Sequence, residues 1–223
     1  LVEKGISVIS EIEFTAPFTN AITIGITGSN GKTTTTMLTY HLLKNAGLNV
    51  ALGGNIGKSF AWQVAEHNYD VYVLELSSFQ LDGIINYKPH IAILTNISPD
   101  HLDRYEYKYE NYIASKFRIT MNQTASDYLI YDADDEATQE WLKHNTTKAQ
   151  LIPFSISQTL DLGAFLKDNN MEVKMNQEEF SMETEYIALE GKHNMKNAMA
   201  ATSVAKLMQI RNATIRESLS NFQ

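Results

Sequence analysis

The feature that most constrains the fold is a glycine-rich segment at residues 27–34, which reads TGSNGKTT. It follows a short apolar, β-branched run at residues 21–27 and precedes a stretch with helical spacing at residues 32–46, which Gly47 ends. In a strand–loop–helix setting, backbone N–H groups turn toward phosphate oxygens, and the helix N-terminus favours negative charge. We therefore predict a phosphate-binding loop formed by Gly28, Ser29, Asn30, Gly31, Lys32, Thr33 and Thr34.

Two side chains of this loop carry the expected chemistry. Lys32 can reach the β and γ phosphates of a nucleotide, and the Thr33 hydroxyl can hold Mg²⁺. The usual pattern places a glycine where this chain has Ile26, so the loop fits a shorter G-x-x-G-K-T variant, with Gly25 one residue further back. The alternative is an ordinary glycine turn. GTPases, kinases, ATPases and ligases share such loops, so the loop alone does not name a reaction.

The remaining pattern predicts an α/β fold with a mostly parallel sheet flanked by helices. Residues 71–76 and 91–97 are nearly continuous apolar runs, typical of strands that are covered on both faces. A small antiparallel hairpin or meander is expected at 172–182, and residues up to Pro17 are expected to be a tail or linker. The other expected strands are 49–52 and 128–131, and the expected helices are 58–67, 107–121, 136–144 and 194–208.

Composition excludes several classes of protein. The formal net charge of -8, from 26 acidic and 18 basic side chains, argues against a nucleic-acid partner. The absence of cysteine excludes disulfides, thiolate zinc sites and a cysteine nucleophile, and fits a reducing compartment. We find neither an apolar run of about 20 residues that could cross a membrane nor a signal-peptide layout. We therefore predict a globular, cytoplasmic protein without a membrane partner.

Two groups are expected near the phosphate loop. Glu75 lies near the end of an otherwise apolar strand, where a carboxylate is costly unless it is paired or bound to a metal. We favour Mg²⁺ over a salt bridge, because ligands gather at the carboxyl ends of parallel strands. His101 follows the next strand and could ligate a metal, orient a phosphate or only make a capping hydrogen bond. Thr33, Glu75 and His101 are expected at neighbouring strand ends.

Three further polar residues are ambiguous. Lys116 falls on a mostly apolar helical stripe with Tyr109 and Ile113. It is either a lysine that reaches solvent past the edge of the core or a desolvated amine that is partly neutral and reactive. Asn194 could be an N-cap of the last helix, and Asn197, one turn on, presents a second amide; both could bind a base or phosphate.

Taken together, these segments resemble the Mur ligase family over nearly the whole chain. The phosphate loop looks like that family's ATP loop. Residues 75–81, which read ELSSFQL, resemble the branch that adds D-glutamate. So do the segments GNIG at 54–57, DHLDR at 100–104 and HNMKN at 193–197. Folylpolyglutamate synthases belong to the same family and are the alternative enzyme, and a nucleotide-binding module without chemistry is the alternative outside enzymes.

The resemblance implies an ATP-dependent, ADP-forming ligase of peptidoglycan precursor synthesis that joins D-glutamate to UDP-N-acetylmuramoyl-L-alanine through an acyl phosphate. It assigns ATP binding to the loop with Asn194 and Asn197, and binding of the muramoyl substrate to Asn55, Ser77 and Gln80. It implies two Mg²⁺ ions held by Thr33, Glu75, His101 and Lys116, the last as a carbamylated lysine. Catalysis is then assigned to Lys32, Glu75, His101 and Lys116.

The resemblance also implies a division into domains. Residues 1–17 would be the tail of an N-terminal UDP-binding domain or a linker, and residues 18–223 the central ATP-binding domain. A C-terminal domain that binds the amino acid would be absent. We therefore expect the chain by itself to be inactive in ligation, and we expect a monomer.

Overall fold

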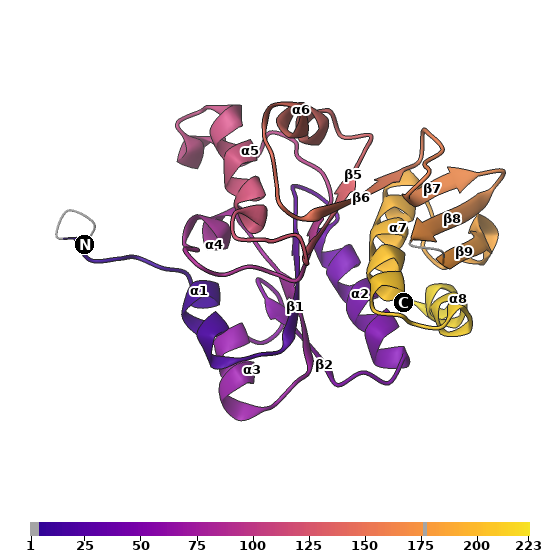
Figure 1. Ribbon diagram of the computed structural model, residues 1–223, viewed down its shortest axis with the longest axis horizontal. Coiled ribbons are helices and arrows are strands. Elements are labelled where there is room, and N and C mark those ends of the chain that lie inside the picture. The colour runs from indigo at the N-terminus through magenta and orange to yellow at the C-terminus, as the bar shows by residue number, and fades with distance from the viewer. Residues whose placement is uncertain (1–4, 176–177) are drawn as a thin grey trace.

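The computed structural model describes residues 5–175 and 178–223. Its centre is a nine-stranded sheet with the order β2-β3-β1-β4-β5-β6-β7-β8-β9 (Figure 1). The strands are β1 Ile22–Thr27, β2 Val50–Gly54, β3 Val71–Glu75, β4 Ile91–Leu94, β5 Tyr128–Asp132, β6 Gln150–Ser155, β7 Gly163–Lys167, β8 Asn170–Met175 and β9 Glu178–Glu183. The strands from β2 to β7 pair in parallel, which confirms the predicted α/β class.

Helices cover both faces of the sheet. The α-helices are α1 Glu11–Thr15, α2 Lys32–Asn45, α3 Phe60–Glu66, α4 Ser78–Asp82, α5 Tyr109–Phe117, α6 Glu136–His144, α7 Lys192–Leu207 and α8 Asn212–Asn221. Side chains of α2, α7 and α8 share one hydrophobic core with Ile24 and Ile26 of β1. Those of α1, α3, α4, α5 and α6 share a second core with Tyr72 and Leu74 of β3. Alternate side chains of a strand therefore enter opposite cores, which explains the continuous apolar runs.

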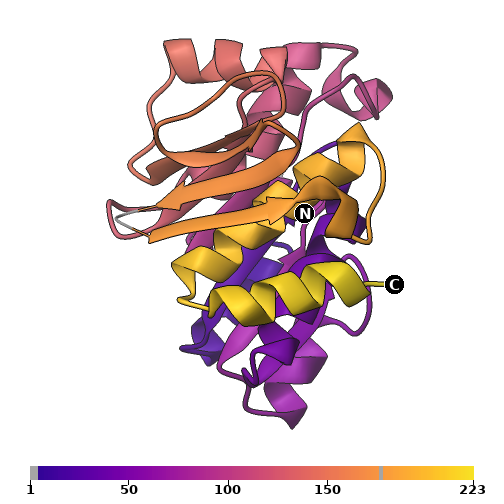
Figure 2. The same cartoon turned by 90° about the vertical axis from the view of Figure 1, so that its right-hand side faces the viewer.

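The hairpin or meander predicted at 172–182 is confirmed by the antiparallel pairing of β8 with β9, although residues 176 and 177 lie outside the described part of the chain. Strand β8 also pairs antiparallel with β7, and β7 pairs in parallel with β6, so the three strands extend the main sheet. Figure 2 shows these strands beside α7 and α8. The sequence did not reveal β6 or β7 because their apolar and polar residues alternate only weakly. Gly163 begins β7 with φ 105°, where a Cβ would lie 2.0 Å from the Pro153 carbonyl oxygen.

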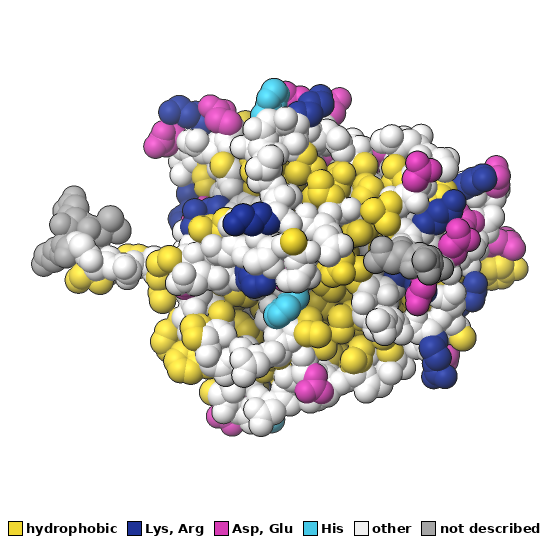
Figure 3. Space-filling view, viewed as in Figure 1, with side chains coloured by type: hydrophobic (Ala, Val, Ile, Leu, Met, Phe, Trp, Pro, Cys, Tyr) yellow, Lys and Arg dark blue, Asp and Glu magenta, His cyan; other side chains and the backbone are white. Residues whose placement is uncertain are grey.

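The segment predicted to be a tail or linker contains a packed helix. Ile12 of α1 is fully buried, and the Glu13 carboxylate accepts hydrogen bonds from the backbone N–H groups of Ile85, Asn86 and Tyr87 at 2.8–3.0 Å. Residues 5–10 precede this helix and extend from the body (Figures 1 and 3). Exposed apolar side chains occur here at Ile6, Val8, Ile9, Phe14 and Phe18.

Several predicted boundaries were wrong. The strand predicted at 91–97 ends at Leu94, and the helix predicted at 107–121 spans Tyr109–Phe117 with a 3-10 turn, Arg118–Thr120, after it. Helix α8 was missed because its apolar stripe is narrow. Helix α4 is too short to show periodicity, although its S-x-x-Q start was a usable signal. Within the described residues, no helix is long and apolar enough to span a bilayer.

Candidate nucleotide site

The predicted phosphate loop joins β1 to α2 and is shaped by two glycines. Gly31 is the N-cap of α2 with φ 80°, and a Cβ there would lie 2.5 Å from the Asn197 side-chain oxygen. Gly28 has φ 145°, and a Cβ there would lie 2.0 Å from the Thr95 hydroxyl oxygen. Neither position tolerates a side chain. The geometry of the strand, glycine loop and helix is therefore the predicted one, and anion binding at the helix N-terminus stays a prediction.

The segment after β4 holds the loop in place. The Ser29 N–H donates to the Asn96 carbonyl oxygen at 2.8 Å, and the Asn30 N–H donates to the Asn96 side-chain oxygen at 3.0 Å. The Ser29 hydroxyl donates to the Ser98 carbonyl oxygen and accepts from the Ser98 N–H, both at 2.9 Å. The Thr95 hydroxyl donates to the Asn30 carbonyl oxygen at 2.7 Å. These contacts preorganise the loop before any ligand binds.

Lys32 lies in the first turn of α2 and folds back over the loop. Its Nζ donates to the carbonyl oxygens of Gly28 and Ser29, both at 2.9 Å. The side chain is partly exposed, so its ammonium can exchange these neutral acceptors for phosphate oxygens. A charged acceptor gives the stronger hydrogen bond, which favours that exchange.

Glu75, at the end of β3, meets the loop directly. Its carboxylate accepts from the Thr33 hydroxyl at 2.7 Å and from the Asn55 side-chain amide at 3.0 Å, and only 2% of Glu75 is exposed. Both partners are neutral, so the salt-bridge alternative does not hold for the described residues. A hydroxyl beside a carboxylate fits Mg²⁺, which binds through one or two carboxylates and substrate phosphates.

Lys116 on α5 reaches the same loop from the other side. Its Nζ donates to the Gly28 carbonyl oxygen at 2.9 Å, and the residue is 2% exposed. The predicted alternative, a lysine that reaches solvent past the core, is therefore wrong. Burial and the neighbouring Lys32 charge lower the pKa of Lys116 to about 7. A substantial fraction of this amine is neutral near neutral pH, as a nucleophilic amine requires.

His101 lies further out on the same edge. Its backbone is left-handed with φ 48°, its ring packs against Phe79 of α4 at 5.2 Å between centroids, and its Nε2 lies 3.5 Å from an Asp100 carboxylate oxygen. The strand order β3-β1-β4 does place Glu75, Thr33 and His101 after neighbouring strands. The structure gives no contact between His101 and Glu75, and no cluster of three acidic or histidine metal ligands occurs within the described part of the chain.

Ser77 and Gln80 form a capping box at the start of α4. The Ser77 hydroxyl accepts from the Gln80 N–H at 3.2 Å, and the Gln80 side-chain oxygen accepts from the Ser77 N–H at 2.9 Å. This arrangement fixes the N-cap of α4 two residues after the end of β3 at Glu75. Their predicted role toward a substrate therefore coexists with a structural one.

The two asparagines of α7 have different surroundings. Asn197 is buried, and its side-chain oxygen accepts from the Thr35 hydroxyl at 3.1 Å. Asn194 is not the N-cap, because α7 begins at Lys192 after Gly191. Its amide instead donates to the Glu190 carbonyl oxygen at 2.9 Å. Only Asn197 of the two lines a cavity of about 500 Å³ beside the loop.

This cavity contains charged residues that sequence reasoning missed. Lys196 lies 2.7 Å from an Asp132 carboxylate oxygen and 3.3 Å from one of Asp134. Hydrogen bonds from Ser155, Ser157 and the Ile156 N–H, together with Lys196, offset the effect of burial and lower the pKa of Asp134 to about 2. The available signal was the position of Asp132 and Asp134 at the end of the strand predicted at 128–131.

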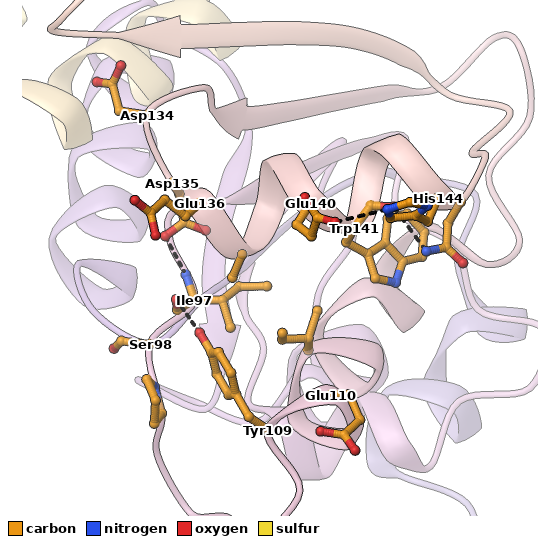
Figure 4. Close-up of a pocket in the computed structure, with 14 residues that line it drawn as sticks. Ile97, Ser98, Tyr109, Glu110, Asp134, Asp135, Glu136, Glu140, Trp141 and His144 are labelled. Atoms are coloured by element: carbon orange, nitrogen blue, oxygen red, sulfur yellow. Dashed lines mark hydrogen bonds and ion pairs between the residues drawn. The ribbon is translucent and has the colours of Figure 1, made fainter.

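A second cavity of about 740 Å³ lies between α5 and α6. Figure 4 shows its side chains, with Tyr109 on one wall and Trp141 on another. The Tyr109 hydroxyl donates to the Ile97 carbonyl oxygen at 2.7 Å, and Asp135 accepts from the Ile97 N–H at 3.2 Å. The residue after Ile97 is Ser98, the partner of Ser29, so this cavity adjoins the support of the phosphate loop.

The fold and the loop have the arrangement of P-loop α/β domains, with charged groups at the carboxyl ends of the strands. Residues 26–205 match the family described as Mur ligase middle domain. The match covers most of the chain, and the chain belongs to the Mur ligase family.

Similar proteins are found among curated sequences. The chain is 60% identical over its whole length to a UDP-N-acetylmuramoylalanine--D-glutamate ligase of Christiangramia forsetii, of which it covers 50%. It is 51% identical, over 99% of its length, to the ligase of the same name in Bacteroides fragilis, of which it again covers 50%. The chain therefore spans about half the length of the curated relatives it matches.

Solved structures share the fold at low sequence identity. A UDP-N-acetylmuramoyl-L-alanyl-D-glutamate--2,6-diaminopimelate ligase superposes with a TM-score of 0.73 at 20% identity, covering 92% of this chain and 47% of the other. MurF of Acinetobacter baumannii superposes with a TM-score of 0.71 at 20% identity, covering 96% and 48%. These likenesses support the fold alone.

Proposed function

We propose that this chain is the ATP-binding core of a longer enzyme that joins D-glutamate to UDP-N-acetylmuramoyl-L-alanine. The observation that carries the proposal is the contact between Thr33 on the phosphate loop and Glu75 at the neighbouring strand end. It brings a phosphate cradle and a carboxylate together where a nucleotide–Mg²⁺ complex needs both. The 60% identity to a D-glutamate ligase supports the choice of substrates.

The proposed chemistry activates a carboxylate before it forms an amide. The carboxylate oxygen of the muramoyl-alanine substrate attacks the γ-phosphorus of ATP, the bond to the ADP oxygen breaks, and an acyl phosphate results. The D-glutamate amine then attacks the acyl carbon, loses a proton and displaces phosphate. Lys32 stabilises charge on the transferring phosphoryl group, and the N–H groups at the start of α2 hold its oxygens.

Glu75 and Thr33 are proposed to hold Mg²⁺, with His101 on the outer side of the same edge. The ion would neutralise charge on the β and γ phosphates when bound. Lys116 is proposed to add CO₂: its neutral amine forms an N–C bond, releases one proton and becomes a carbamate, a ligand for a second Mg²⁺. Its burial and lowered pKa support this step, because the neutral amine is the nucleophile.

The remaining assignments are also proposals. Asn55, Ser77 and Gln80 are proposed to contact the muramoyl substrate, and the hydrogen bond from Asn55 to Glu75 supports this for Asn55. Asn197 at the cavity and Asn194 next to it, at 3.3 Å, are proposed to face the nucleotide. Residues 18–223 are proposed to be the central domain. The cytoplasmic location and the monomeric state stay predictions.

The test uses the full-length protein with ATP, Mg²⁺, UDP-N-acetylmuramoyl-L-alanine and D-glutamate. We expect ADP, phosphate and the ligated product in equal amounts, and little ADP when L-glutamate replaces D-glutamate. Equal ADP release with neither amino acid would indicate a plain ATPase. Turnover of a folate with glutamate, and none of the muramoyl substrate, would indicate the folylpolyglutamate branch of the family.

A further inference from the structure

One carboxylate outside the proposed catalytic set connects three elements that carry site residues. Asp82 is the last residue of α4, and its carboxylate accepts from the Tyr105 hydroxyl at 2.9 Å and from the Ser115 hydroxyl at 2.8 Å. Tyr105 ends the 3-10 turn that follows His101, and Ser115 precedes Lys116 on α5. Ser77 and Gln80 begin the helix on which Asp82 lies.

The two hydroxyl groups that meet Asp82 are themselves well packed. Tyr105 is 7% exposed and Ser115 is 4% exposed, and their oxygens lie 3.0 Å apart. Both hydroxyl groups donate to the same carboxylate, so the position of Asp82 sets the direction in which each hydroxyl points. The cluster is therefore rigid compared with an exposed ion pair.

The same helix also contacts the ring of His101. Phe79, one turn before Asp82, contacts this ring, and the Arg104 guanidinium lies 4.3 Å from the centre of the Phe79 ring. The Arg104 Nε lies 3.7 Å from Asp82. Phe79 and Asp82 are three residues apart, so both face the His101 turn from one side of α4.

A second connection between α4 and α5 does not involve Asp82. Arg118 donates to the carbonyl oxygens of Leu81 at 2.7 Å and Ile84 at 2.6 Å. Loss of the Asp82 carboxylate therefore leaves α5 attached to the α4 region through Arg118. What it removes is the contact of Asp82 with Tyr105 in the His101 turn and with Ser115, the residue before Lys116.

We propose that Asp82 is a positioning residue that sets His101 and Lys116 at their distances from the Glu75 edge. It touches neither nucleotide nor substrate in this proposal, and acts through Tyr105 and Ser115. The proposal rests on the function proposed above, because that function assigns Mg²⁺ binding to His101 and Lys116. Displacement of a catalytic group by about 1 Å can cost up to about a hundredfold in rate.

The first test is kinetic, on the full-length enzyme. Asp82→Ala is expected to lower kcat at least about tenfold and to raise the bicarbonate concentration needed for half-maximal activity. Asp82→Asn keeps an acceptor of the same shape and should recover part of the loss. ATP affinity should stay within about twofold, a change of less than about 0.5 kcal/mol, because Asp82 does not contact the phosphate loop. Asp161→Ala, an exposed aspartate on the β6–β7 connection, is the matched control.

A double-mutant cycle separates positioning from general weakening of the fold. If Asp82 acts through Ser115, the Asp82→Ala and Ser115→Ala losses in kcat should be non-additive, and the double variant should resemble Asp82→Ala. Additive losses, or a bicarbonate dependence identical to that of the unmodified enzyme, would overturn the proposal. Thermal unfolding of each variant shows whether the fold is intact.

A readout without catalysis distinguishes this proposal from the proposed function. This chain is titrated with ¹³C-bicarbonate, and its carbamate signal is followed by ¹³C NMR. Lys116→Met should remove that signal, which assigns it to Lys116. Asp82→Ala should require more bicarbonate for the same signal and should shift the His101 amide resonance. If the full-length enzyme does not ligate D-glutamate, the proposed function fails, whereas the His101 shift still tests the positioning. An unchanged His101 resonance and carbamate titration would refute it.

Discussion

Lys32 and Lys116 donate hydrogen bonds to the same acceptor, the carbonyl oxygen of Gly28, each at 2.9 Å. They approach it from different elements, Lys32 from α2 and Lys116 from α5. Two full positive charges this close repel each other. Two features reduce this repulsion. Lys32 is partly exposed and can bind a phosphate in place of the Gly28 carbonyl oxygen, and buried Lys116 has a lowered pKa.

The first prediction concerns Lys32. Lys32→Ala should weaken ATP binding by about ten- to a hundredfold, because a charge-assisted hydrogen bond to phosphate contributes about 1.5–3 kcal/mol. Calorimetric titration of the chain with ATP and Mg²⁺ measures this. Lys44→Ala, which removes an exposed lysine at the far end of the same helix, should leave the affinity unchanged. Equal weakening by both variants would point to an effect of overall charge.

The second prediction concerns the glycine that both lysines contact. Gly28→Ala should lower the free energy of unfolding by about 3 kcal/mol, because strained backbone and overlap with Thr95 each cost about 1–3 kcal/mol. Gly47→Ala is the matched control: its φ is 82°, but no atom lies within 4 Å of the added Cβ, so a cost of about 1 kcal/mol is expected. Urea unfolding compares the two. Similar losses would mean that the Thr95 contact is easily relieved.

The third prediction concerns pH and Lys116. Its pKa is lowered from 10.5 to about 7 in the folded protein, so between these values the unfolded chain binds more protons than the folded one. This group therefore makes stability rise with pH across that window, with a slope of up to about 1.4 kcal/mol per pH unit. Lys116→Met should remove that slope. Urea unfolding at several pH values in CO₂-free buffer measures the difference between the two proteins, and a difference that is flat above pH 7 would contradict the lowered pKa.

The fourth prediction concerns α1. Burial alone would raise the pKa of Glu13, but hydrogen bonds from the backbone of Ile85, Tyr87 and Asn86 lower it below the ordinary glutamate value of 4.5. The stabilisation is thus present above pH 4.5 and is lost as pH falls through the lowered pKa. Glu13→Gln should cost about 2 kcal/mol at pH 7, measured by urea unfolding. Glu66→Gln, at an exposed position of α3, is the control. No cost for Glu13→Gln would mean that α1 is held by Ile12 alone.

The local pattern was sufficient for the phosphate loop and the parallel sheet. A strand, two glycines and a lysine at the start of a helix impose that geometry through short-range sterics, so residues 27–34 could be interpreted without the rest of the chain. The apolar runs of β3 and β4 indicated strands that are buried on both faces, because the side chains on each face of such a strand must be apolar. Strand β7 alternates only weakly and gave no such signal, because it depends mainly on pairing and packing with its neighbours β6 and β8.

Local sequence patterns were enough to predict the α/β class, the glycine-rich loop and the polar residues around it. Which of these residues meet became visible only in the folded chain. The tertiary structure placed Glu75 on Thr33, buried Lys116 against Gly28, kept His101 apart from Glu75 and joined Asp82 to Tyr105 and Ser115. Contacts of this kind depend on the order of the strands and on the direction of each side chain. Both are set by packing between residues that are far apart in the sequence, in the two cores on either face of the sheet.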